Sequence, residues 1–334
     1  MKIIHVFFGD ADKHPIVQNY QNLETEIIDA PKAKDFGRTQ RALRLVKDLR
    51  CRLKKVNNKE KNAILHCHDP VSLMIALFLH SRRDIIFDAH EVYSSYIKNK
   101  ILRFIIFQVE WILVRIPKKT IFPSYERGKI FFEKKEKFFV IENKLNDKNI
   151  PPNTKKEKKE KSNEIRCIFV GTFTDIRACR EIIQATNLVK NEGYEITLDL
   201  FGSKNAFIEN LIQFFPDYIT FHGHINQKDL FERYKKYDIG FALYKPINLN
   251  NLYCAPTKIF EHEYFGVKTV AYNSAYISRK IRYKEFGNCT PTNSFDPSDI
   301  SEAIKIANDR TLEKVEQKSL LWSSQSNEIL KLYK

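Results

Sequence analysis

Short runs of β-branched and aromatic residues alternate with longer amphipathic stretches along most of the chain. KIIHVFF near the start and AILHCH further on have the composition of strands, and helical patterns lie between such runs. After residue 164 the alternation begins again with IRCIFVG and EITLDLFG. Strands that alternate with helices predict parallel sheets joined by right-handed crossovers. Apolar runs without polar alternation are typical of strands covered on both faces, so we expect an α/β protein.

A polar stretch separates the two alternating halves. Residues 147–164 contain two prolines and then a run of lysines and glutamates, the composition of a linker or an exposed loop. A length of 334 residues is also sufficient for two cores. We expect a first domain at 1–146 and a second at 165–317, followed by a helical segment at about 318–334.

The composition suggests what kind of partner the protein binds. Hydrophobic residues make up 43% and charged residues 29%, as in ordinary globular proteins, but the formal net charge is +15. This excess favours an anionic partner, which is either a phosphate-bearing ligand, a membrane surface or nucleic acid. The abundance of Lys, Asn, Ile and Phe leaves a second source open, a base-composition bias of the genome.

The cysteines and the N-terminus indicate the compartment. The six cysteines form no CxxC pair and lie mostly in apolar runs, which favours reduced, buried thiols over disulfides or a zinc site. The first apolar run meets acidic residues at once, so it predicts a strand and lacks the length of a signal peptide. We therefore expect a cytoplasmic protein.

Residues 98–139 combine apolar and basic character. The run ILRFIIFQVEWILVRI is short for a bilayer span and is interrupted by charged residues. Eleven basic and four acidic residues give 98–139 a net charge of +7. Two interpretations remain open: a buried helix of an α/β domain, or a surface whose aromatics insert into an anionic membrane at its inner face.

Residues that follow the predicted strands are candidates for ligand binding, because open parallel sheets bind ligands beyond the carboxyl ends of their strands. In the first half we expect Gly9 and Asp10 on the acceptor side of a site and His90 close to the reacting group. In the second half the same rule selects Gly171, Ser203 and His222. Glycines at such positions let the backbone approach a ligand closely.

His66, His68 and Asp69 suggest a metal site at first sight. Residues 66 and 68 of a strand point to the same side. However, the sequence shows no further ligands that would complete the set, and we expect no metal.

The segment 253–271, YCAPTKIFEHEYFGVKTVA, carries the most specific chemistry. Pro256 suits the first turn of a helix and Gly266 suits its end. The N–H groups at Thr257 and Lys258, together with the positive end of the helix dipole, would bind a diphosphate.

Glu261 lies one turn further along this helix. Its carboxylate accepts hydrogen bonds and suits the two hydroxyls of a ribose. Glu263, its neighbour on the same helix, is expected on the surface.

The segment 253–271 resembles the donor-site motif of family 4 glycosyltransferases (glycosyl transferases group 1), retaining enzymes of the GT-B fold. FVGTFTDIRACREIIQA resembles the family's loop in which a basic residue, here Arg177, meets the diphosphate. HCHDP and DAHEVY resemble the strand ends that place His90 beside the transferred sugar. The end of the chain, SLLWSSQSNEILKLYK, resembles the helix that returns to the first domain. The family's first motif glutamate is replaced by Tyr253, whose hydroxyl can still bond a sugar.

The resemblance implies two Rossmann-like parallel-sheet domains that face a central cleft. It also implies transfer of a sugar from a nucleotide donor, such as a UDP- or GDP-sugar, to an acceptor hydroxyl with retention of configuration. Arg177 and Lys258 would stabilise the leaving diphosphate without a metal or another cofactor. A glycan or lipid-linked acceptor would place the enzyme in the assembly of a bacterial surface polysaccharide or glycolipid.

Two other functions remain to be distinguished. A sugar-nucleotide epimerase can have the same fold, but it needs acid and base groups around the donor sugar, and the sequence offers no convincing set. A non-catalytic protein could bind membrane or nucleic acid through its basic surface. No nucleic-acid-binding motif is visible, so we expect no nucleic-acid partner.

Overall fold

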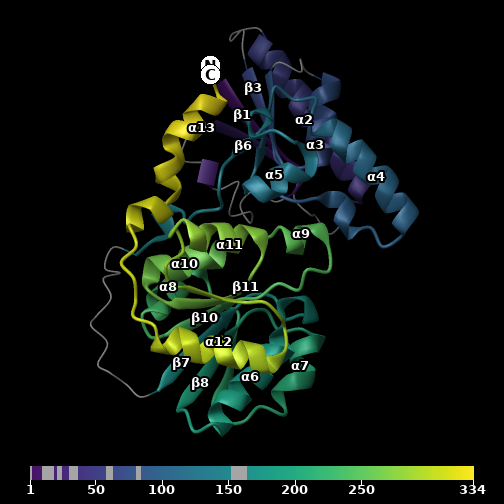
Figure 1. The fold of residues 1–334 in the computed structure, drawn as a ribbon. Coiled ribbons are helices and arrows are strands. Elements are labelled where there is room, and N and C mark those ends of the chain that lie inside the picture. Colours follow the sequence, from purple (N-terminus) through teal and green to yellow (C-terminus); the bar gives the residue numbers. More distant parts are fainter. Residues whose placement is uncertain are drawn as a thin grey trace. The chain divides into compact units, whose positions relative to one another are not determined.

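The computed structural model describes residues 2–9, 19–20, 25–29, 37–57, 63–79, 84–151 and 164–334. The chain forms two compact units, each built around its own sheet (Figure 1). Unit 1 comprises Met1–Asn143 and Gln325–Lys334, and unit 2 comprises Lys144–Ser324. Of the expected linker at 147–164, residues 152–163 lie outside the described part of the chain.

Unit 1 contains a parallel six-stranded sheet with the strand order β2-β1-β3-β4-β5-β6. The two central strands β3 and β4 are buried along their whole length because helices cover both faces. The strands are β1 (Lys2–Phe7), β2 (Thr25–Asp29), β3 (Ala63–Cys67), β4 (Ile85–Asp88), β5 (Lys119–Phe122) and β6 (Phe139–Val140).

Helices and short 3-10 turns connect these strands. They are α2 (Arg38–Asn57), α3 (Pro70–Leu79), η3 (Tyr93–Tyr96), α4 (Lys100–Leu113), α5 (Tyr125–Phe131), η4 (Lys135–Lys137) and the C-terminal α13 (Ser326–Leu332). The last of these belongs to unit 1 although the whole of unit 2, Lys144–Ser324, precedes it in the chain. Lys119 Nζ donates to the backbone oxygen of Lys331 over 2.6 Å, and the Gln325 side chain bonds both backbone groups of Glu142.

Helix α4 differs from the other helices in what it buries. Asn99 caps it by accepting hydrogen bonds from the backbone of Ile101 and Leu102. Glu110 is the one buried side chain of α4, and most of the apolar side chains are exposed. The interpretation of the apolar stretch in 98–139 as a buried helix is therefore wrong. The helix packs on η3 by a narrow face that carries Glu110, and its other sides remain exposed.

Unit 2 has a second parallel six-stranded sheet, β12-β11-β10-β7-β8-β9. From β9 the order is 3-2-1-4-5-6, that of Rossmann sheets, and the strand order reverses between β7 and β10. The strands are β7 (Ile165–Val170), β8 (Ile196–Phe201), β9 (Ile219–Gly223), β10 (Ile239–Ala242), β11 (Lys268–Tyr272) and β12 (Cys289–Thr292).

Two hydrophobic cores lie on the two faces of this sheet. Val270 and Ala271 are neighbours on β11 and point to opposite faces of the sheet. Val270 packs in one core with Ile182 and Ile300, whereas Ala271 packs in the other with Ile259.

Helices and short 3-10 turns connect the strands of this sheet and follow it to the end of unit 2. They are η5 (Asp147–Asn149), η6 (Asp175–Arg177), α6 (Cys179–Asn191), α7 (Ala206–Ile212), α8 (Gln227–Tyr234), α9 (Leu249–Leu252), α10 (Thr257–Phe265), α11 (Ala275–Arg282), α12 (Pro297–Asp309), η7 (Gln317–Leu320) and η8 (Trp322–Gln325).

The predicted fold class is confirmed in its two parallel sheets with helices and in the return of the C-terminal helix to the first unit. The six cysteines are free thiols, and Cys51 is exposed while four others are buried. Within the described ranges, no helix has both the length and the apolarity needed to cross a membrane.

Candidate active site

The start of α10 has the geometry of an anion site. Pro256 occupies the N-cap position in an extended conformation, and no side chain caps the helix. The backbone N–H groups of Thr257 and Lys258 are therefore available together with the positive end of the helix dipole, whereas that of Ile259 donates to the Pro256 oxygen at 3.3 Å. Gly266 ends the helix at a φ of 64°, a left-handed conformation that glycine adopts easily. The predicted bounds of this helix are thus correct.

Glu261 is buried, with 3% of its surface exposed. One carboxylate oxygen, Oε2, accepts from the Tyr234 hydroxyl at 2.6 Å and from Lys258 Nζ at 2.7 Å. Burial raises the pKa of Tyr234 well above its usual value, and the Glu261 charge adds to this, so the hydroxyl remains a donor. The Lys258 side chain is 23% exposed and so is the one member of this group that reaches solvent. The arrangement joins a fixed carboxylate to a cation at the helix start.

Arg177 lies close to this group through Tyr244. The guanidinium carbon is 3.9 Å from the centre of the Tyr244 ring, a cation–π contact. Burial raises the pKa of Tyr244 to about 12, the Arg177 charge lowers it and the Glu261 charge raises it. Tyr244 thus lies within electrostatic reach of both Arg177 and Glu261, the cation and carboxylate that the sequence predicted for one site.

Two further residues of this region were not predicted. Lys245 Nζ donates to Asp175 at 2.8 Å and to Glu181 at 2.7 Å, so its charge is neutralised by carboxylates. Tyr244 and Lys245 lie two and three residues after the end of β10, where the strand-end rule would have selected both. Tyr234 carried no such signal, because it is the last residue of a helix, α8, and lies 27 residues from Glu261 in the sequence.

The glycines at the ends of β7 and β8 approach each other closely. Gly171 has a φ of 155°, which side-chain-bearing residues rarely adopt. A Cβ on Gly202 would lie 2.0 Å from the Gly171 oxygen, so this contact requires a glycine. Ser203, the predicted neighbour, is exposed directly after this contact. The carboxyl ends of β7 and β8 therefore expose backbone groups and one small side chain, Ser203.

His222 has a structural environment. Its Nε2 is 2.8 Å from Asp199 Oδ1, and its ring stacks on Phe201 with centroids 4.6 Å apart. It borders a cavity of about 1010 Å³ beside α8. Of the predicted donor-site residues, this cavity is lined by His222 alone. Tyr253 lies between α9 and α10 and is partly exposed.

Glu263 corrects an expectation. It was expected on the surface but is 4% exposed, and its carboxylate accepts from the backbone and side chain of Asn288 at 2.9 and 2.8 Å. Burial raises its pKa to about 7. The reason is that six of the nine residues of α10 are buried, so the helix is enclosed on several sides and has no wide polar face.

In unit 1, His90 follows β4 and is 7% exposed. Its Nε2 lies 3.1 Å from His68 Nδ1, and its Nδ1 lies 3.7 Å from a carboxylate oxygen of Asp88. Its backbone oxygen accepts from the guanidinium of Arg127. Both ring nitrogens therefore face neighbouring side chains of unit 1. Gly9 follows β1, and Asp10 lies outside the described residues.

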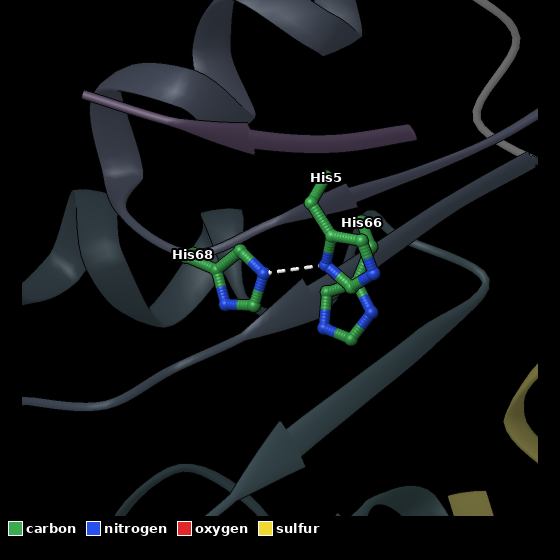
Figure 2. Close-up of side chains that lie close together, drawn as sticks. All are labelled: His5, His66 and His68. Atoms are coloured by element: carbon green, nitrogen blue, oxygen red, sulfur yellow. Dashed lines mark hydrogen bonds between the residues drawn. The ribbon is translucent and has the colours of Figure 1, made fainter. Parts of the chain in front are cut away.

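A cluster of buried histidines surrounds this point. His5 from β1 lies opposite His66 of β3 in the parallel register, and His68 follows β3 (Figure 2). The expectation that His66 and His68 lack further candidate ligands is wrong: ligand atoms lie within 4.8 Å of one another in His5, His66 and His68. The same holds for His68, Asp88 and His90. Sequence could not show this because the strand order and register bring these residues together.

No family model matches the sequence, and no curated protein matches it. Solved structures do. Sucrose-phosphate synthase from Thermosynechococcus elongatus has 13% identity and a TM-score of 0.64 over 100% of this chain and 98% of its own. A glycosyltransferase from Rickettsia africae has 13% identity and a TM-score of 0.64 over 99% and 97%. A Listeria monocytogenes protein assigned as a UDP-N-acetylglucosamine 2-epimerase has 11% identity and a TM-score of 0.60 over 98% and 94%. At these identities the similarity shows the fold, and it is the GT-B fold that the sequence predicted.

Proposed function

We propose that this protein is a glycosyltransferase that moves a sugar from a nucleoside-diphosphate donor to an acceptor hydroxyl. The observation that carries the proposal is the convergence, at the start of α10, of uncapped N–H groups, Lys258 and buried Glu261. The fold similarity to a glycosyltransferase and to sucrose-phosphate synthase agrees with it. We assign the donor to the α10 side rather than to the cavity beside α8, whose rim is made of solvated charges of both signs.

The charges at α10 suggest how the donor is held. The diphosphate would lie against the first turn, with Lys258 and Arg177 as cations. Lys258 would then give up its bond to Glu261 and bind a phosphate oxygen instead. The Glu261 carboxylate would accept hydrogen bonds from the two ribose hydroxyls in place of the one from Lys258. Tyr234 keeps Glu261 in position throughout this exchange. Backbone at Gly171 and Ser203, with Thr257 and Tyr253, completes the proposed donor contacts.

The chemistry would then be placement and charge stabilisation. The cations stabilise the negative charge that develops on the leaving diphosphate. In the proposed reaction the anomeric configuration is retained, the leaving phosphate takes the proton of the acceptor hydroxyl, and neither a metal nor another cofactor takes part. We assign acceptor recognition to the side of Gly9 and Asp10.

A measurement of nucleotide binding tests this assignment. UDP, GDP, dTDP and ADP are titrated against the wild type and two matched variants, Glu261→Gln and Glu263→Gln. Loss of a charged hydrogen bond of about 1.5–3 kcal/mol should weaken the preferred nucleotide at least about tenfold in Glu261→Gln. Glu263→Gln alters an equally buried carboxylate that bonds Asn288 and should bind like the wild type. Equal affinity in all three proteins would overturn the role of Glu261.

An epimerase of the same fold is the second candidate, because one similar structure is assigned to that class. Such an enzyme needs acid and base groups at the donor sugar. Near α10, Glu261 is occupied by Tyr234 and Lys258, and Glu263 by Asn288. Transfer is therefore favoured. An isomerised sugar nucleotide, formed from the donor without an acceptor, would instead identify an epimerase.

We further propose that α4 binds an anionic membrane surface and that the acceptor is lipid-linked or a glycan at that surface. Glu110 fixes the inner side of α4 by accepting from the backbone of Tyr93 and from the backbone and hydroxyl of Ser94. The outer side is apolar apart from Lys100 at the helix start and Gln108. Its exposed members are Ile101, Leu102, Phe104, Ile105, Val109, Trp111 and Ile112, with exposures of 41–74%. Globular proteins rarely leave such a contiguous apolar face in water.

Basic residues at the end of α4 indicate which membrane fits. Trp111, Arg115, Lys118, Lys134 and Lys137 line a cavity of about 660 Å³ there. Cations beside an inserted apolar face are complementary to anionic lipid headgroups. With 14 residues, α4 is shorter than the roughly 20 that a span requires, so we place it in the plane of the interface. Cosedimentation with phosphatidylglycerol vesicles should capture the protein, and phosphatidylcholine vesicles should capture far less. No binding to either would overturn the membrane proposal.

A further inference from the structure

The cavity of about 660 Å³ at the end of α4 lies at the amino edge of the sheet in unit 1. Pro117 and Lys118 line it and come directly before β5, and Lys137 lines it just before β6. Strands β4, β5 and β6 run parallel, so their amino ends share one edge. His90 follows the carboxyl end of β4. The cavity is therefore at the opposite edge of the sheet from His90 and from the proposed site of transfer.

Arg115 holds the wall of this cavity in place. Its guanidinium carbon lies 3.3 Å from the centre of the Trp111 ring and 4.8 Å from that of the Phe132 ring. The guanidinium donates to the backbone oxygen of Trp111 at 2.5 Å and to that of Phe131. These oxygens belong to the C-terminal ends of α4 and α5, where the helix dipoles are negative. Arg115 thus joins two helix ends, and they balance part of its charge.

Three exposed lysines supply the remaining positive charge of the cavity: Lys118, Lys134 and Lys137. None of them forms an ion pair with a carboxylate in the part of the chain that the structure describes. Glu133 is the one acidic residue of the described lining, and its charge also raises the pKa of Arg115, which burial lowers. Three lysines and one glutamate give a net charge of +2. The cavity therefore matches an anion with about two negative charges.

The cavity opens beside the exposed apolar face of α4. Trp111 belongs to both, because it lines the cavity and is 41% exposed. Phe104 lies two helical turns before Trp111, so the two side chains point to the same side of α4. A ligand whose anionic group fills the cavity therefore has its next atoms against an apolar surface. A phosphate attached to a hydrocarbon chain has this combination of properties.

We propose that this cavity binds the phosphomonoester headgroup of one lipid molecule. Lys118, Lys134 and Lys137 bind the phosphate oxygens, while Trp111 and Phe132 contact the first atoms of the hydrocarbon part. A phosphomonoester carries about −1.5 to −2 charges at neutral pH, and a phosphodiester carries a single charge. The site therefore selects phosphatidic acid over phosphatidylglycerol. The lipid as source of the phosphate rests on the proposed membrane contact of α4, whereas the phosphate site itself does not.

Such a site adds to the membrane contact what diffuse attraction does not provide. Lysines that attract an anionic surface act over a Debye length and fix no orientation. A headgroup held in the cavity fixes how the end of α4 meets the membrane. Because the cavity lies at the amino edge of the sheet, its lipid is an anchor and not the acceptor, which we assign to the side of Gly9 and Asp10.

Calorimetric titration of the full chain tests the proposal with soluble probes: dihexanoyl phosphatidic acid, dihexanoyl phosphatidylglycerol and inorganic phosphate. Phosphatidic acid should bind saturably and at least about fivefold more tightly than either of the others. The second probe lacks one charge, and the third lacks the hydrocarbon part. No vesicle and no sugar donor is present, so failure of the membrane or transferase proposal does not affect the result.

Each other outcome contradicts a stated part of the proposal. Without saturable binding of phosphatidic acid, there is no phosphate site. Equal affinity for phosphatidic acid and phosphatidylglycerol would overturn the selection of a phosphomonoester. Inorganic phosphate that binds as tightly as phosphatidic acid would overturn the lipid as the source of the phosphate.

Variants locate the bound probe. Lys134→Gln and Lys137→Gln should each weaken phosphatidic acid about fivefold. Lys135→Gln is the matched control, because Lys135 lies between them in η4, is equally exposed and does not line the cavity. It should bind like the wild type. An equal loss in all three variants would show that general positive charge attracts the probe, and the proposal would fail.

Trp111 gives an independent readout at the cavity. The chain has two tryptophans, Trp111 and Trp322. Phosphatidic acid should change the fluorescence of the wild type, because its hydrocarbon part covers Trp111, and this change should be absent in Trp111→Phe. A change that persists in Trp111→Phe would place the lipid elsewhere and overturn the assignment to this cavity.

Discussion

The two units present the same architecture and opposite electrostatics at the edges where ligands of parallel sheets bind. In unit 2, the cations Lys258 and Arg177 lie around an uncapped helix start and a buried carboxylate. In unit 1, the buried side chains of His5, His68 and His90 lie near Asp88, and their hydrogen bonds run from ring to ring. Under the proposed function, the first arrangement would suit a ligand with fixed negative charge, and the second would suit uncharged hydroxyl groups. The residues at the strand ends, and not the fold, make this difference.

The largest expected effect concerns the charges of unit 2. Arg177→Ala and Lys258→Ala should each weaken the preferred nucleoside diphosphate about 10- to 100-fold, because each removes a charged hydrogen bond to phosphate. Affinity for the corresponding nucleoside, which lacks phosphate, should not change. Isothermal titration with the two ligands measures the difference.

Lys245→Ala is the control for this experiment. Lys245 follows Tyr244, the residue whose ring contacts Arg177, but Asp175 and Glu181 already neutralise its charge. We expect wild-type affinity. An equal loss in all three variants would mean that unit 2 attracts anions through its general positive charge and would remove the contrast with unit 1.

The second effect concerns Glu263, whose pKa of about 7 lies above its usual value of 4.5. The folded state binds more protons than the unfolded state between these values. The stability that this proton contributes is full below pH 4.5 and is lost as the pH rises to 7. Glu263→Gln resembles the protonated form, so its free energy of unfolding relative to wild type should rise by about 3 kcal/mol across this range.

Urea unfolding at a series of pH values measures this difference. Trp322 lies in unit 2 and is 5% exposed, so its fluorescence follows that unit in a Trp111→Phe background. Subtraction of the wild-type curve removes the contribution of other titrating groups. A difference between variant and wild type that stays constant with pH would show that Glu263 ionises normally in the folded state.

The third effect tests the close approach of backbone in unit 2. Gly202→Ala should destabilise this unit by about 1–3 kcal/mol, since the new Cβ would meet the Gly171 oxygen and neighbouring chain must shift. Ser203→Ala changes the exposed neighbour and should stay within about 0.5 kcal/mol of wild type. The fluorescence of Trp322 measures both. If the two variants are equally stable, the glycine contact is not a constraint on the sheet edge.

The sequence predicted the features that local patterns determine. Pro256 and Gly266 bound α10 as expected, because helix starts and ends depend on nearby residues. The alternation of strands and helices predicted both parallel sheets. The burial of Glu263 could not be predicted in this way, because Asn288 lies 25 residues away.

The cluster of buried histidines in unit 1 shows the same limit more strongly. His5 and His68 are 63 residues apart, and only the order and register of β1 and β3 bring them into hydrogen-bond distance. The roles predicted for Glu261, Arg177 and His90 remain predictions, since the structure gives their surroundings and not their ligands. For 98–139 the sequence left two interpretations open, because an apolar helix pattern does not reveal which face the fold covers.

The smallest expected effect concerns the exposed apolar face of α4, and it extends the comparison of the two units to their surfaces. Phe104→Ser on α4 removes a side chain that is 64% exposed. It should reduce partition onto phosphatidylglycerol vesicles about tenfold, because the variant loses part of the free energy gained by burying a phenylalanine in the membrane. Because the side chain packs little in the folded unit, the melting temperature should hardly change.

The matched control lies in unit 2, where Phe214 is 76% exposed and no other large hydrophobic side chain between Leu188 and Ile247 is exposed. Phe214→Ser should leave vesicle binding unchanged if the membrane meets α4 alone. Equal losses would indicate non-specific adsorption of exposed aromatics, and no loss in either variant would leave the basic residues as the whole of the attraction. A loss confined to Phe104→Ser, together with binding that requires anionic lipid, would show that unit 1 joins an apolar anchor to a cationic rim, while unit 2 reserves its cations for a diphosphate.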